Sequence, residues 1–77
     1  MIRVVNNGEV VLITFVHGKI RITVKKNGDV IKVVDDELIK DAVKQIREFV
    51  DEDTFVMVTD VLRTILRAQK QRENVPA

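Results

Sequence analysis

The side chains that most often perform chemistry in proteins are few in this sequence and widely spaced. The chain has no Cys, Ser, Tyr or Trp, and His17 is its one histidine. A zinc site needs several His or Cys ligands, and nucleophilic catalysis needs a Ser, Cys or Thr beside a base. His17 directly precedes Gly18, which is typical of a turn residue. We therefore predict no catalytic residue, no metal site and no cofactor, and we expect a protein that is not an enzyme.

Two acidic clusters are the next candidates for chemistry, at residues 35–37 and 51–53. Carboxylates bind hard cations, but a calcium loop spaces its ligands at alternate positions around a glycine, and neither cluster has this pattern. Asp is also a preferred residue at the amino end of a helix, where it accepts hydrogen bonds from free backbone N–H groups. Because each cluster precedes a helical pattern, we predict two helix caps, the first at Asp35–Asp36.

The first half of the chain is divided by glycines at positions 8, 18 and 28, preceded by Asn7, His17 and Asn27. A type I′ hairpin turn needs positive φ at both central residues, and Asn followed by Gly satisfies this need best. The spacing predicts four antiparallel strands joined by two-residue turns. The expected strands are at about residues 2–6, 9–16, 19–26 and 29–34.

Counting back from each turn gives a strand register that can be checked. One face of the sheet is then entirely apolar. Its residues are Ile2, Val4, Val11, Ile13, Phe15, Ile20, Ile22, Val24, Ile31 and Val33. A slip of one residue at any turn would move a strand's apolar side chains to the other face. We predict that this face carries the core.

The second half of the chain repeats apolar side chains with a helical period. We expect one helix at about residues 36–51 and a second at about 54–72, with a frayed tail at 73–77. Residues 54–59 are rich in β-branched side chains and are compatible with a fifth strand, and a single fused helix is another alternative. The predicted fold is α+β, a single domain over residues 1–72. It is a four-stranded antiparallel β-meander covered on one face by a C-terminal helical hairpin, in the order ββββαα.

The opposite face of the sheet needs an explanation, because its aliphatic half would be exposed. Contiguous apolar patches on a protein surface usually contact a partner. The apolar stripe of the second helix is also wider than one neighbour requires. The predicted protein interface consists of Val5, Val10, Leu12 and Val16 on the sheet and Met57 and Val61 on the helix.

The other half of this face is basic and suggests a different function. Its cations could contact phosphates of a nucleic acid, although the face has no aromatic side chain on which bases could stack. The residues concerned are Arg3, Lys19, Arg21, Lys25 and Lys32. The net charge of the whole chain is only +1, so no global field attracts a polyanion.

The sequence favours a non-catalytic protein–protein interaction or assembly module of a small regulatory, viral or mobile-element type. Its expected partner is a second copy of itself, as a homodimer, or another protein. A nucleic-acid-binding protein is the first alternative. A designed protein without biological function is the second, because its turns are so evenly spaced. No small-molecule substrate is expected. No unbroken apolar run is longer than Val10–Ile13, which is far too short to span a membrane. We therefore expect no membrane partner and a cytoplasmic location.

Overall fold

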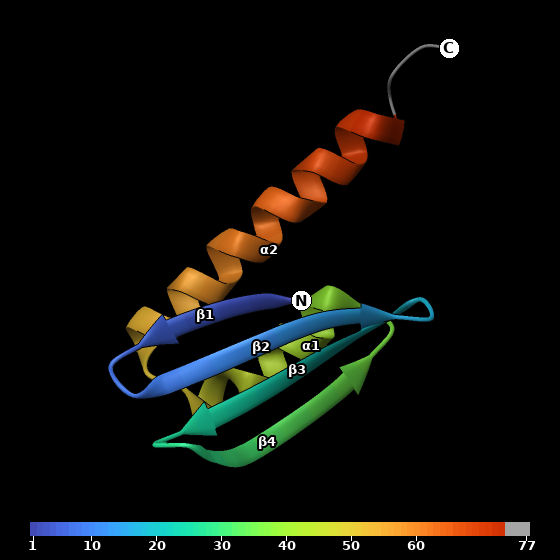
Figure 1. Cartoon of the computed structure of the whole chain (residues 1–77). Coiled ribbons are helices and arrows are strands. Elements are labelled where there is room, and N and C mark those ends of the chain that lie inside the picture. Colours follow the sequence, from blue (N-terminus) through green and yellow to red (C-terminus); the bar gives the residue numbers. More distant parts are fainter. Residues whose placement is uncertain (74–77) are drawn as a thin grey trace.

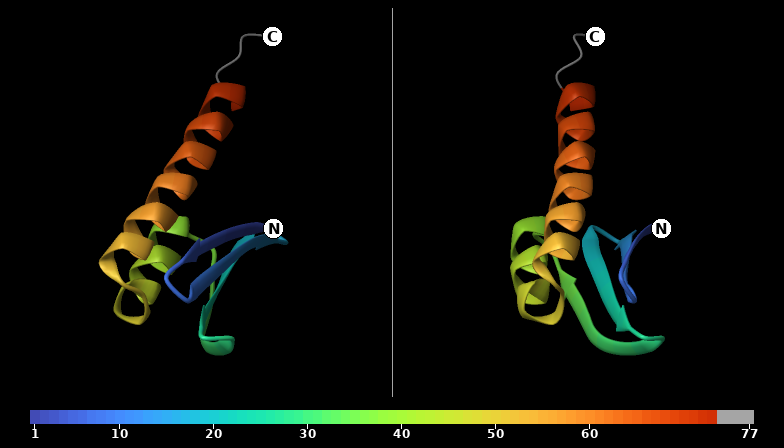
Figure 2. Two further views of the ribbon diagram at one scale, coloured as in Figure 1. Left: turned by 60° about the vertical axis from the view of Figure 1, so that its left-hand side comes forward. Right: turned by 90° about the vertical axis from the view of Figure 1, so that its left-hand side faces the viewer.

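The computed structural model describes residues 1–73, and the side chains of residues 1–68. Four strands form one antiparallel sheet in the order β1-β2-β3-β4, and the helices follow them. The elements are β1 Ile2–Asn6, β2 Glu9–Val16, β3 Lys19–Lys26, β4 Asp29–Asp36, α1 Ile39–Ile46, the 3₁₀ turn η1 Arg47–Phe49, and α2 Glu52–Glu73. The helices lie on one face of the sheet and leave the other open (Figures 1 and 2). The α+β meander predicted from the sequence is confirmed.

The three hairpin turns have the backbone geometry that their residues favour. Asn7, His17 and Asn27 all have positive φ, between 48° and 51°, and each is followed by a glycine with positive φ. Both central residues of each turn are therefore left-handed, as a type I′ turn requires. These turns pair Asn6 with Glu9 and Val16 with Lys19, which confirms the register of the first three strands.

The core face of β1, β2 and β3 agrees with the sequence pattern. Six of the predicted core residues on these strands are buried: Val4, Val11, Ile13, Ile20, Ile22 and Val24. Phe15 is an exception, with 46% of its surface exposed. The pairing of β1 with β2 begins at Ile2 and Ile13, so no residue of β1 lies beside Phe15.

The predicted register of β4 is wrong beyond its first residues. Lys25 pairs with Val30, but Val24 pairs with Lys32, so Ile31 is the extra residue of a β-bulge. A bulge moves every later side chain to the opposite face. Val34 is therefore the buried residue, only 2% exposed, whereas Val33 is 51% exposed.

The charges at the end of β4 give a physical reason for the bulge. Without it, the ladder would place Asp35 opposite Ile20, on the core face, where an unpaired carboxylate is costly. With it, Asp35 lies opposite Arg21 on the outer face, and the guanidinium Nε donates to its carboxylate at 2.7 Å. The following residue, Asp36, faces the helix side, where its carboxylate accepts hydrogen bonds from the Leu38 N–H and the Gln45 amide, each at 3.0 Å.

The helices begin and end differently from the prediction. Because β4 continues to Asp36, α1 begins only at Ile39, and its N-cap residue is Leu38 rather than an aspartate.

Val50 is extended and separates η1 from α2, so the two helices are not fused. Residues 54–59 are helical, which excludes the fifth strand. Glu73 is the last residue of α2, and the rest of the predicted frayed tail lies outside the described residues.

The core forms between the sheet and the two helices. Ala42 and Ile46 of α1 and Val58 and Leu62 of α2 are buried against the strands. The carboxyl-terminal part of α2 continues past the sheet and projects away from it (Figure 1). Within residues 1–73, neither helix has a stretch of apolar side chains long enough to cross a membrane.

Candidate functional site

Rows of side chains cross the sheet face that the helices leave open. The strand pairing joins one row through all four strands, namely Val5, Val10, Lys25 and Val30. The adjacent row consists of Arg3, Leu12, Thr23 and Val33. Each row therefore combines one cation with aliphatic side chains. We call this surface, including Val16, Lys19, Arg21 and Asp35 at its far end, the outer face.

Several aliphatic side chains of the outer face are open to solvent. Val5 and Val30 are each 54% exposed, and Val16 is 41% exposed. Val10 and Leu12 are partly covered, because they line a shallow hollow together with Met1, Arg3, Lys25 and Gly28. The sequence thus correctly placed Val5, Val10, Leu12 and Val16 on one face. The bulge adds Val33, which the sequence had assigned to the core.

The predicted basic group is not a continuous stripe. Lys32 lies on the helix side, with its Nζ 5.2 Å from the centre of the Phe49 ring. The Arg21 guanidinium, which lowers the pKa of Asp35 through their hydrogen bond, is paired on the surface. Among the described residues of the outer face, Arg3, Lys19 and Lys25 form no ion pair.

The two predicted interface residues of the second helix lie on a different surface. Met57 is 40% exposed, and Val61 is partly buried against the core. Both belong to α2, which covers the sheet face opposite to the outer face (Figure 2). The structure therefore presents two separate apolar surfaces rather than one.

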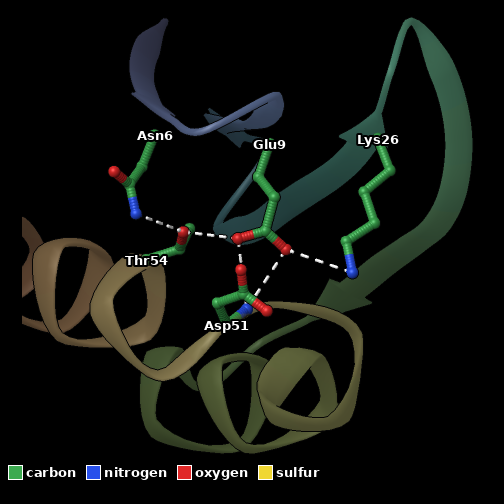
Figure 3. A network of polar contacts seen from close by, with 5 residues as sticks. All are labelled: Asn6, Glu9, Lys26, Asp51 and Thr54. Atoms are coloured by element: carbon green, nitrogen blue, oxygen red, sulfur yellow. Dashed lines mark hydrogen bonds and ion pairs between the residues drawn. The ribbon is translucent and has the colours of Figure 1, made fainter.

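A buried carboxylate joins three distant parts of the chain, and the sequence pattern did not single it out. Glu9 is only 1% exposed. Its carboxylate accepts hydrogen bonds from the Asp51 N–H, at 3.1 Å to each oxygen, and from the Thr54 hydroxyl at 2.5 Å (Figure 3). Thr54 in turn accepts a bond from the Asn6 amide at 3.1 Å, and Lys26 Nζ lies 3.4 Å from the carboxylate.

The position of Glu9 in the strand is the signal that could have identified it. Glu9 has the same alternation as Val11 and Ile13, so it must point to the core side of the sheet. A carboxylate at a buried position needs several hydrogen-bond donors. Those donors are at the amino end of α2, where Asp51 is the residue before the helix and Thr54 is in its first turn.

Opposing effects act on the pKa of Glu9. Burial, the largest single effect, raises it, whereas the hydrogen bonds from Thr54 and the Asp51 N–H and the charge of Lys26 lower it. Together the lowering effects prevail, and the pKa is below its ordinary value. Glu9 is therefore ionised at neutral pH. Because its carboxylate is buried and hydrogen-bonded to the amino end of α2, it attaches this helix to the sheet and is not accessible to a substrate.

The remaining chemical candidates from the sequence are apart from one another. His17 is exposed at the tip of the second hairpin. The first acidic cluster lies at the end of β4, before α1 begins, and the second lies at the amino end of α2. Over residues 1–73, no three His, Cys, Asp or Glu side chains come together in a way that could hold a metal ion.

Comparison of the chain with models of known protein families, with curated proteins and with solved structures found no match.

Proposed function

We propose that this protein is a non-catalytic protein–protein interaction module that acts as a homodimer. The observation that carries the proposal is its exposed aliphatic surface on two sides. Val5, Val30 and Val33 are each more than half exposed on the outer face, and Met57 is 40% exposed on α2. Apolar patches of this kind mark contact sites with other proteins.

The charges of the outer face favour a protein partner with acidic side chains. Arg3 and Lys25 border the hollow that contains Val10 and Leu12. A partner that places apolar groups in the hollow and carboxylates at its border would complement both features. Nucleic acid is less well matched, because Arg21 is paired with Asp35 and no aromatic ring lies in either row.

The first expected result is a dimer in solution. The chain has a mass of 8.8 kDa, so multi-angle light scattering on a sizing column should give about twice this value. The mass should hold across a hundredfold dilution and should depend only moderately on salt, because apolar contacts dominate. Fluorescence anisotropy with labelled single- and double-stranded oligonucleotides at low salt serves as the comparison. A monomer at every concentration, or tight and steeply salt-dependent oligonucleotide binding, would contradict the proposal.

A further inference from the structure

We infer that a second copy of the chain binds along one flank of α2, with the two helices antiparallel. This inference rests on the proposed homodimer and assigns the surface that forms it. The flank consists of Met57, Val61, Thr64 and Ala68, spaced by four, three and four residues. This spacing places all four side chains in one line along a helix and is the spacing of a two-helix seam.

The flank is suited to close contact with another helix. Met57 is 40% exposed, and Thr64 and Ala68 are exposed, so their side chains are open to a neighbour. The Thr64 hydroxyl donates to the Asp60 carbonyl at 2.9 Å. Since this donor already has a partner within its own helix, covering Thr64 leaves no hydroxyl hydrogen unsatisfied.

Side-chain sizes favour the antiparallel direction. If Val61 of one copy lies opposite Thr64 of the other, then Met57 lies opposite Ala68. Each large side chain thus meets a small one, which allows the two helices to pack closely. The carboxyl-terminal part of α2 projects past the sheet (Figure 1). The antiparallel arrangement would place this part of each copy beside the amino-terminal half of α2 in the other copy.

Charge complementarity supports the same direction. Asp60 and Arg67 are exposed on the same edge of the flank, seven residues apart. Among the described residues, neither forms an ion pair. In the antiparallel register Asp60 of each copy approaches Arg67 of the other, so two opposite-charge pairs form by symmetry. A parallel pair would instead bring Asp60 toward Ile65 of the other copy, so these opposite-charge pairs would not form.

The outer face is less suited to self-contact. It carries Arg3, Lys19, Arg21 and Lys25 against the single acid Asp35, which leaves three positive charges in excess (4 − 1). Two copies meeting through this face would bring like charges together, which costs binding free energy. The flank of α2 is self-complementary, and it leaves the outer face free for another protein.

A charge exchange tests the inference directly. Asp60→Arg and Arg67→Asp should each weaken the dimer by about tenfold or more. In each single variant, positions 60 and 67 carry the same charge, and symmetry places them opposite each other at two points of the interface. A mixture of the two variants should form a 1:1 heterodimer, and the double variant Asp60→Arg/Arg67→Asp should recover the homodimer. Arg63→Asp, at an exposed position on the opposite flank of α2, is the matched control and should leave the mass unchanged. Circular dichroism checks that every variant is folded.

Engineered thiols test the helix direction independently of stability. Because the chain has no Cys, every disulfide formed in a mixture of Met57→Cys and Ala68→Cys proteins joins two of these engineered positions. Mild oxidation should give the mixed disulfide dimer in excess over Met57→Cys self-dimers. Preferential self-linking through position 57 would overturn the antiparallel arrangement.

The outcomes separate failure of the inference from failure of the proposed function. A wild-type protein that is monomeric in solution would contradict the proposed homodimer itself. A wild-type dimer that tolerates both charge variants and dissociates in Leu12→Lys would keep the homodimer and overturn its assignment to α2. A dimer that responds to the charge variants and tolerates Leu12→Lys would support the flank of α2 as the self-contact.

Discussion

Val34→Lys should destabilise the protein far more than Val33→Lys. Val34 is 2% exposed and pairs with the fully buried Ile22, so a lysine there would place its ammonium group in the core. An unpaired buried charge costs several kcal/mol, which is a large part of the about 5–15 kcal/mol that stabilises a typical domain. We therefore expect a loss of about 4 kcal/mol or more in the free energy of unfolding, or a chain that does not fold.

Val33→Lys is the matched control on the neighbouring residue. Val33 is 51% exposed on the outer face, opposite Thr23, so its lysine would extend into solvent. The expected change is within about 0.5 kcal/mol. Urea denaturation followed by circular dichroism gives both values, with all proteins compared in the same association state. The reverse ranking would mean that β4 has no bulge and continues in the straight register.

This pair of residues also shows where sequence reasoning reaches its limit. The turns at Asn7–Gly8 and Asn27–Gly28 each encode their own geometry, so the pairing next to them follows from local chemistry. The bulge at Ile31 has no such local sign. Val33 and Val34 are equally apolar, and alternation alone cannot tell which of them is buried.

The choice between Val33 and Val34 depends on partners elsewhere in the chain. Asp35 gains the Arg21 guanidinium on β3, and Asp36 gains the Leu38 N–H, only when the strand is shifted. The same shift removes Lys32 from the predicted basic group and places it beside Phe49. For this reason the fold and the first three strands could be predicted, whereas the contribution of β4 to the outer face could not.

The buried cluster around Glu9 was missed for a different reason. The apolar pattern of β2 is visible at Val11 and Ile13, but Glu9 is charged and so does not belong to that pattern, although it lies on the same face of the strand. Its donors come from residues 51 and 54, more than 40 positions away. Alternation can therefore identify a buried carboxylate, but only the packing of α2 on the sheet shows which groups satisfy it.

Glu9→Ala should produce the second large loss of stability. The substitution removes the acceptor of the Asp51 N–H and of the Thr54 hydroxyl, and unsatisfied buried groups cost about 1–3 kcal/mol each. We expect the free energy of unfolding to fall by about 2–4 kcal/mol. Glu48→Ala, at an exposed position on η1, is the control and should change it by less than about 0.5 kcal/mol.

Lys26→Ala separates the two kinds of contact made by Glu9. The Lys26 side chain is 44% exposed and its ammonium lies 3.4 Å from the carboxylate, so solvent weakens this ion pair. Its loss should cost less than about 1 kcal/mol. If Lys26→Ala were as damaging as Glu9→Ala, the charge pair and not the hydrogen bonds to α2 would hold the helix in place.

The pH dependence of stability gives a test of the charge on Glu9. Its pKa in the folded protein is below the value of 4.5 that an unperturbed glutamate has. The ionised carboxylate therefore stabilises the fold fully above about pH 4.5, and this contribution disappears as the pH falls through the folded pKa. Glu9→Gln removes the titration but keeps one oxygen acceptor.

The difference in unfolding free energy between the wild type and Glu9→Gln should thus be constant above about pH 5 and should decrease at lower pH. Asp35, whose pKa is also lowered, titrates in both proteins and cancels from the difference. A difference that stays constant down to pH 3 would mean that Glu9 is not held as a carboxylate.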